Sequence, residues 1–166
     1  DLVTADLGTP QVLGETKVAV DRVFAVLDRA SRTRTRPTVP QDDLDGLERA
    51  AATGDVTARL LWCHALLYED RYREAVDAAR PMLAELSPAS IAYVTVLNTM
   101  AWCLLMAGDV ERGGAADTAS AEAHHLQPSA PAVCGTRGSV LIELGDVDRG
   151  LALVLASMAG DDDETN

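Results

Sequence analysis

A short motif, a turn followed by a small residue, recurs three times along this chain of 166 residues and constrains its fold more than any other feature. The copies are Asp70-Arg71-Tyr72 before Ala75, Gly108-Asp109-Val110 before Gly113, and Gly145-Asp146-Val147 before Gly150. Successive small residues are 38 and 37 positions apart. Recurrence at an interval of about 20 to 50 residues is typical of repeat proteins, in which each unit buries its apolar face against the next. We therefore expect a stack of similar structural units.

A second small residue precedes each of the first by twelve positions, in the middle of an apolar segment: Cys63, Ala101 and Gly138. Large side chains at a helix crossing hold the two backbones apart, whereas small ones let them approach. Each copy is therefore expected to be an antiparallel pair of helices that cross where the two small residues meet. Apolar residues make up 48% of the chain but aromatic residues only 4%, so Ala, Leu and Val must fill most contacts between the helices.

Caps and helix breakers set the expected boundaries of the helices. Gln41-Asp42-Asp43, for example, places carboxylates at a helix N-terminus, where they interact favourably with the helix dipole, and Gly54 ends that helix. We expect helices at about residues 10–30, 41–54, 56–68, 72–86, 89–107, 109–126, 131–144 and 147–159. No segment alternates apolar and polar residues over the length of a strand. The predicted fold class is therefore all-α.

The chain is expected to have three parts. Residues 1–40 form an N-terminal helix and a basic linker, residues 41–160 hold the helical repeats, and residues 161–166 form an acidic tail that we expect to be disordered. The N-terminal helix could cap the repeats through an apolar stripe of Val12, Val18, Val23, Phe24 and Leu27. The linker carries Arg32, Arg34 and Arg36, which we interpret as solvated, although they could also contact phosphates or an acidic partner.

The repeated pattern resembles the tetratricopeptide repeat family, whose units are antiparallel helix pairs joined by a Gly-Asp-like turn. The resemblance covers about residues 56–160, or three repeats, and rests on residues 104–110 and 141–147 for the turn and 72–76 for the opening of a second helix. It implies a right-handed α-α superhelix, a solenoid with a concave face lined by the first helix of each pair. The sequence departs from the family in its longer intervals and in Gly113 and Gly150, where the family has alanine.

The resemblance also implies a groove for a peptide or a partner helix on the exposed side of the first helices. The residues that it places there are His64, Leu67, Tyr68, Asn98, Trp102, Leu105, Ser139, Ile142 and Glu143. Their spacing agrees, since Asn98, Trp102 and Leu105 follow i, i+4 and i+7 on one helical stripe. A competing interpretation assigns Trp102 and Tyr68 to the core. Because the stripe has no Lys or Arg to bind a carboxylate, we expect a mixed apolar and hydrogen-bonding groove.

The charge of the chain limits the classes of partner. Its formal net charge is −12, whereas proteins that bind nucleic acid present basic surfaces, so nucleic acid is disfavoured. No apolar run approaches the roughly 18 residues that a membrane span needs. We therefore expect a cytoplasmic protein, or the cytoplasmic part of a larger one. Thirteen Arg against one Lys is a composition that we associate with GC-rich bacterial genomes.

Neither metal binding nor catalysis is predicted, and no cofactor is expected. The three cysteines, Cys63, Cys103 and Cys134, form no CxxC pair and are interpreted as buried thiols. His124 and His125 could bind a metal with Cys134 or Glu122, but adjacent side chains on a helix point about 100° apart and do not converge. The same divergence argues against catalysis by Cys63 or Cys103 with His64.

The sequence therefore predicts a non-catalytic interaction module that binds a protein or peptide, or that associates with itself. An alternative of another class is the soluble regulatory or C-terminal domain of a larger enzyme, such as a membrane-bound protease or kinase.

Overall fold

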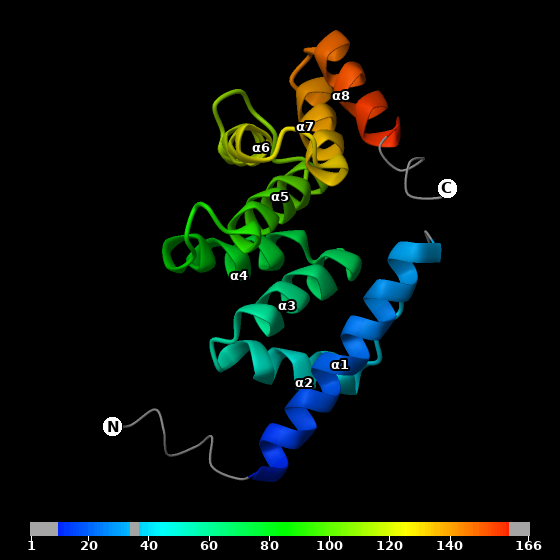
Figure 1. The fold of residues 1–166 in the computed structure, drawn as a ribbon, viewed down its shortest axis with the longest axis vertical. Helices are drawn as coiled ribbons and strands as arrows, with labels where there is room; N and C mark the ends of the chain where they lie inside the picture. Colours follow the sequence, from blue (N-terminus) through cyan, green and yellow to red (C-terminus); the bar gives the residue numbers. More distant parts are fainter. Residues whose placement is uncertain (1–9, 34–36, 160–166) are drawn as a thin grey trace. The chain divides into compact units, whose positions relative to one another are not determined.

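A computed structural model describes residues 10–33 and 37–159. This part of the chain forms eight α-helices and contains no strand, which confirms the all-α prediction (Figure 1). The helices are α1 (Pro10–Thr33), α2 (Gln41–Ala52), α3 (Val56–Tyr68), α4 (Tyr72–Glu85), α5 (Ile91–Met106), α6 (Ala115–Leu126), α7 (Pro131–Glu143) and α8 (Val147–Ala159). The bounds of α3 and α8 are those predicted, and the other predicted bounds differ by at most three residues, except at the start of α6.

Some predictions concern residues outside the described part of the chain. These are the acidic tail, residues 161–166, and the linker residues Arg34 and Arg36. The side chains of Val12 and Arg32 also lie outside it.

The start of α6 is where the predicted boundaries are wrong. The sequence predicts a helix from about residue 109, but α6 begins six residues later. Gly113 belongs to the intervening loop and has a φ of 74°, in the left-handed region that favours glycine. Its N–H donates to the Asp117 carboxylate (2.9 Å), so a side chain from the first turn of α6 binds the backbone of the loop. Gly113 is therefore not a helix-crossing residue, and Ala101 packs instead with buried alanines of α6.

The chain divides into two compact units, Asp1–Arg71 and Tyr72–Asn166. In the first unit α1 packs on both α2 and α3, and α2 packs on α3. The buried core of this unit consists of Val23, Leu27, Val39, Leu44, Leu47, Ala50, Ala58, Leu61 and Ala65. The N-terminal helix therefore shares a core with the two helices that follow it.

Only part of the apolar stripe predicted for α1 is buried. Val23 and Leu27 lie in the core, but Val18 and Phe24 are 47% and 57% exposed, so the prediction is wrong for these two residues. Ala19 is buried instead. Ala19, Val23 and Leu27 follow i, i+4 and i+8, which is the spacing of a single helix face. Val18 and Phe24 are each one residue away from that face and therefore point outward.

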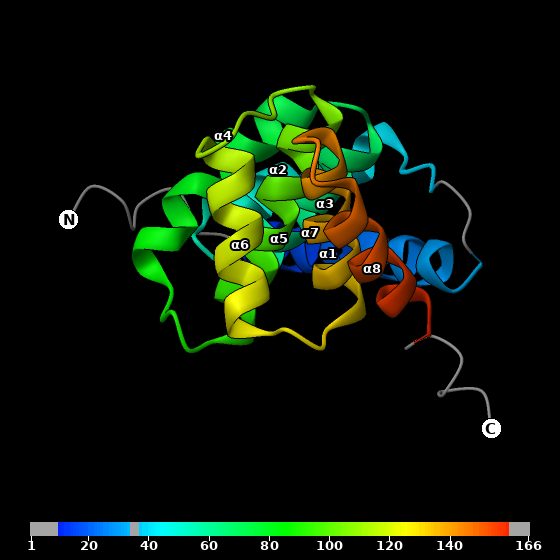
Figure 2. The same ribbon diagram turned by 90° about the horizontal axis from the view of Figure 1, so that it is seen from above.

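In the second unit each helix from α4 to α8 packs on the next, and α5 also packs on α7. Figure 2 shows α7 between α6 and α8, both of which it contacts. One core cluster of this unit contains Val94, Leu97, Ala101, Ala119, Ala123 and Val133. Arg137 joins α7 to α6, because its Nη1 lies 2.6 Å from the Asp117 carboxylate and donates to the Ser120 hydroxyl at 3.0 Å.

The three predicted pairs of small residues have different outcomes. Gly138 and Gly150 meet where α7 and α8 cross, as predicted. The second pair, Ala101 and Gly113, forms no helix crossing because Gly113 lies in the loop before α6. Cys63 and Ala75 are both buried, and they belong to different units.

Candidate functional site

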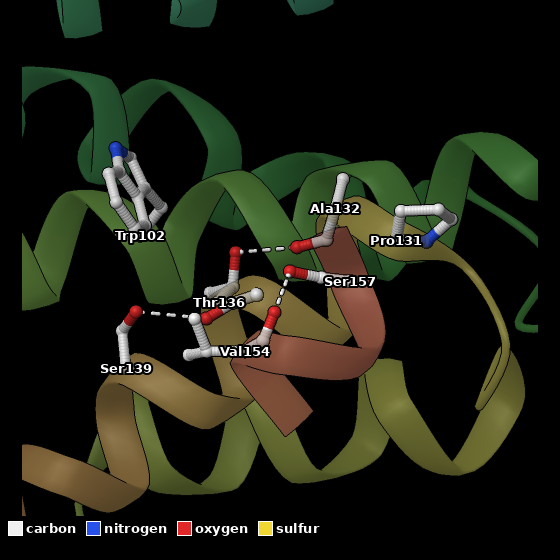
Figure 3. A pocket seen from close by; sticks show the side chains of 8 residues that line it. Trp102, Pro131, Ala132, Thr136, Ser139, Val154 and Ser157 are labelled. Atoms are coloured by element: carbon white, nitrogen blue, oxygen red, sulfur yellow. Dashed lines mark hydrogen bonds between the residues drawn. The ribbon is translucent and has the colours of Figure 1, made fainter. Parts of the chain in front are cut away.

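A pocket of about 390 Å³ opens in the second unit, between α5, α7 and α8. It is lined by Trp102, Pro131, Ala132, Gly135, Thr136, Ser139, Val154 and Ser157 (Figure 3). Trp102 comes from α5, the next five residues from α7, and the last two from α8. Its volume lies at the lower end of the range typical of ligand pockets, about 300 to 1,000 Å³.

The close crossing of α7 and α8 shapes one side of this pocket. A Cβ atom on Gly138 would lie 2.7 Å from the carbonyl oxygen of Gly150 and 2.8 Å from Cγ2 of Val154. A Cβ atom on Gly150 would lie 2.7 Å from the carbonyl oxygen of Gly138. Neither position accepts a side chain without moving one helix away from the other. The two glycines therefore allow α8 to bring Val154 and Ser157 up to α7.

Three hydroxyl groups lie on the pocket lining, and each already donates its proton to its own helix. Thr136 Oγ1 donates to the Ala132 carbonyl at 3.0 Å, and Ser139 Oγ donates to the Gly135 carbonyl at 2.9 Å. Ser157 Oγ donates to the Val154 carbonyl at 2.7 Å (Figure 3). A hydroxyl has one proton and two acceptor lone pairs. The bond that each hydroxyl donates therefore leaves its acceptor lone pairs unused, at half-buried residues for Ser139 and Ser157 and at a buried residue for Thr136.

The rest of the lining is apolar, and no residue of the lining carries a charge. The indole of Trp102 lies to one side of the hydroxyl groups, and Pro131, Ala132 and Val154 add aliphatic surface (Figure 3). The pocket thus combines an aromatic ring, aliphatic contacts and three hydrogen-bond acceptors. Such a lining suits an uncharged group better than an ion, because an ion would lose its hydration without gaining a counter-charge.

Two of the predicted binding residues, Trp102 and Ser139, come together in this pocket. Asn98 lies one turn before Trp102 on α5 and is half-buried. Its Oδ1 is buried and has no hydrogen-bond partner among the described residues. Leu105 is half-buried further along the same helix.

The other two residues predicted on α7 lie near its C-terminal end. Ile142 is half-buried and packs against α8, where its Cγ1 lies 2.6 Å from the position that a Cβ atom on Gly150 would take. Glu143, the last residue of α7, is exposed.

His64, Leu67 and Tyr68 lie on α3, in the first unit, and are all half-buried. Burial lowers the pKa of His64 below its ordinary value, so its imidazole is neutral at physiological pH. Tyr68 packs against the core of the first unit, as the competing interpretation of this residue expects.

Six residues of the pocket lining do not belong to the predicted set: Pro131, Ala132, Gly135, Thr136, Val154 and Ser157. A signal for the α7 residues exists in the sequence, because Ala132, Thr136 and Ser139 follow the same i, i+4, i+7 spacing as the stripe on α5. No comparable signal identifies Val154 and Ser157, since the resemblance places binding residues on first helices only.

The cysteines and histidines form no metal-binding group within the described part of the chain. All three cysteines are buried, and none of them forms a disulfide bond. Burial raises the pKa of Cys63 to about 11, so the unreactive thiol predominates at neutral pH. No group of three or more His, Cys, Asp or Glu side chains among the described residues is arranged to hold a metal ion.

No family model matches this chain, and no curated protein matches its sequence. Of the helices that the structure describes, none combines the length and the apolar character needed to span a bilayer. The pocket and its surroundings are therefore the basis for the functional conclusion.

Proposed function

We propose that this chain is a non-catalytic interaction module that binds a peptide or a partner helix along α5 and α7. In this proposal the chain is a tetratricopeptide-like solenoid, a right-handed α-α superhelix whose first helices present the binding face. The pocket beside Trp102 and Ser139 is the observation that carries the proposal, because two predicted binding residues from different repeats meet in it.

The stripe of α5 next to this pocket supports the same proposal. Asn98, Trp102 and Leu105 are all half-buried, which leaves part of each side chain open to a ligand. The buried Oδ1 of Asn98 makes no hydrogen bond within the described residues. Such an acceptor costs about 1 to 3 kcal/mol in stability. A turn of the Asn98 side chain toward the surface would expose this oxygen, and a backbone N–H of a bound segment would then supply the missing donor.

The charge of the module favours a partner segment that is neutral or basic. Its formal net charge is −12, and no Lys or Arg lines the pocket. A C-terminal carboxylate or a phosphate group would meet no charge-assisted donor there. The partner segment is therefore expected to bind through internal residues rather than through an anionic end.

A capture experiment with matched variants tests the proposal. The native chain, Trp102→Ala and Asn98→Ala would each be used to isolate proteins from a bacterial lysate. Thr118→Ala is the control, because Thr118 is exposed on α6 and does not line the pocket. The proposal predicts proteins that the native chain and the control both retain and that the other two variants lose. Identical sets from all four folded proteins would refute it.

Association with a second copy of the chain is another candidate function, and one observation on α8 favours it. Leu151, Leu155 and Met158 are 48%, 63% and 62% exposed and lie on one side of this helix. In a two-fold dimer the same patch of both copies meets, so this apolar side of α8 could be buried against its counterpart. Light scattering over a range of concentrations would detect a dimer, and Leu155→Glu would abolish it. If the molar mass of the native chain remains that of a monomer at every concentration, self-association is excluded.

A further inference from the structure

We infer that the pocket between α5, α7 and α8 is a subsite for a neutral aromatic group that carries an O–H or N–H donor, such as a tyrosine or tryptophan side chain. This inference rests on the proposed function, because the group would belong to the segment bound along α5 and α7. It adds the chemistry that the subsite selects.

The selection for a donor follows from the hydrogen bonds of the lining. Thr136, Ser139 and Ser157 each donate to a carbonyl of their own helix, at 3.0, 2.9 and 2.7 Å. A ligand donor can add a hydrogen bond to any of these oxygens while the existing bonds remain. A ligand acceptor must first displace a hydroxyl proton from its carbonyl, so that one hydrogen bond merely replaces another. At these three oxygens a ligand donor therefore gains more than a ligand acceptor, and the indole nitrogen of Trp102, which could donate to an acceptor, is turned away from them (Figure 3).

The selection for a ring follows from the apolar part of the lining. The Trp102 indole stands beside the three hydroxyl groups, and Val154 and Pro131 complete the apolar surface (Figure 3). Aromatic pairs in stacked or edge-to-face contact contribute about 0.5 to 1.5 kcal/mol beyond the burial of area. A ring with a polar tip can contact the indole and reach a hydroxyl oxygen together, which an aliphatic alcohol cannot do equally well.

The exclusion of anions follows from the charges around the subsite. No lining residue is charged, and the chain as a whole carries an excess of twelve negative charges. A carboxylate that entered would lose its hydration without an Arg or Lys to compensate for the loss. Tyrosine should therefore be accepted, and phosphotyrosine should be rejected.

The test is a titration of the whole chain with small probes, monitored by NMR at the Trp102 indole N–H and at the backbone amides of α7. The probes are para-cresol, which has a donor, para-methylanisole, which has the same ring without the donor, and para-toluate, which is anionic. One added hydrogen bond of about 1.4 kcal/mol corresponds to a factor of about ten in affinity. We expect para-cresol to bind about tenfold more tightly than either other probe, with shifts confined to the pocket.

Two variants and a matched control assign the selectivity to the hydroxyl oxygens. Thr136→Val keeps the shape of the side chain and removes the oxygen, and Ser139→Ala removes a second oxygen at a half-buried position. Thr95→Val is the control, because Thr95 Oγ1 makes the same kind of bond to the Ile91 carbonyl (2.9 Å) outside the pocket. The preference for para-cresol should shrink in the first two variants and persist in the control. If Thr136→Val fails to fold, Ser139→Ala alone tests whether the hydroxyl oxygens cause the preference for para-cresol.

Equal or tighter binding of para-methylanisole or para-toluate, or no shift at the pocket amides up to the solubility limit of para-cresol, would overturn the inference. Either result can occur while Trp102→Ala still abolishes capture from the lysate. In that case the proposed function stands and the subsite chemistry is wrong. If the chain binds para-cresol selectively but captures no protein, the subsite chemistry stands and the proposed function is wrong.

Discussion

At the scale of single residues, the molecule shows which polar groups serve the fold and which remain open to a ligand. Asp117 is fully used, because its carboxylate accepts from Arg137 and from the N–H of Gly113. Asn98 differs from Asp117, since its Oδ1 has no hydrogen-bond partner within the described residues although it is buried. The hydroxyls of Thr136 and Ser139 are intermediate, with their protons engaged and their lone pairs available.

Replacement of Asn98 by leucine should separate stability from binding. Leucine has a similar volume and removes the unpaired acceptor, so the free energy of unfolding should rise by about 1 kcal/mol. Capture of the partner should weaken in the same variant, because the acceptor for the bound segment is gone. Urea unfolding and the lysate capture measure the two effects. A variant that is less stable and binds as the native chain does would show that Asn98 has a structural role only.

Replacement of Asp117 by asparagine should destabilise the protein in a pH-dependent way. The hydrogen bond from Arg137, followed by that from Gly113, holds the pKa of Asp117 below its ordinary value of 3.8. A carboxyl whose pKa is lowered in the folded state stabilises the protein above its unfolded pKa, and this contribution is lost as pH falls through the folded pKa. The difference in unfolding free energy between the native chain and Asp117→Asn should therefore be largest near pH 7 and should shrink below about pH 4. A difference that is constant between pH 7 and pH 3 would contradict this account.

At the scale of helices, the α7–α8 pair is held at its crossing by two glycines. Alanine at Gly138 would place its Cβ 2.7 Å from a backbone oxygen of α8, whereas alanine at Gly135 would meet Ser157 Oγ at 3.4 Å, an ordinary contact. Gly138→Ala should therefore destabilise the protein by about 1 to 3 kcal/mol, as overpacking does. Gly135→Ala, on the same helix, should be neutral or should stabilise by up to about 1 kcal/mol through helix propensity. Thermal unfolding of both variants checks the contrast, and equal effects would argue against a close crossing.

The helices themselves could be predicted from the sequence because their ends carry local signals. Pro131 opens α7, Asp55 caps α3 through a bond to the Ala58 N–H at 2.7 Å, and positive-φ glycines follow α5 and α7. The start of α6 could not be predicted from the repeated Gly-Asp turn. The adjacent glycines at 113 and 114, both poor helix formers, indicate that the helix begins only after them.

The pocket was predictable only in part. Trp102 and Ser139 could be placed by helical phase, since each lies on a regular stripe of its own helix. Val154 and Ser157 could not, because their position depends on the angle and distance at which α8 crosses α7. That geometry depends on contacts between helices, which the period of one helix does not contain.

At the scale of the whole molecule, charge and exposed surface limit what the chain can bind. The net charge of −12 disfavours anionic partners, and the neutral pocket gives them no compensating cation. The exposed apolar side of α8 offers a second surface, which the self-association candidate uses. The two surfaces can be distinguished, because a partner at the pocket contacts α7 and one at the apolar side contacts Leu155.

Site-specific photo-crosslinking in cells that express the chain distinguishes these two surfaces most directly. A photoreactive phenylalanine analogue would replace Ala132, an exposed residue of the pocket lining, in one protein and Leu155 on α8 in another. We predict a defined crosslinked protein from position 132 that disappears when Trp102→Ala is added. A crosslink from position 155 alone, or one from position 132 that persists without the Trp102 indole, would contradict binding at the pocket.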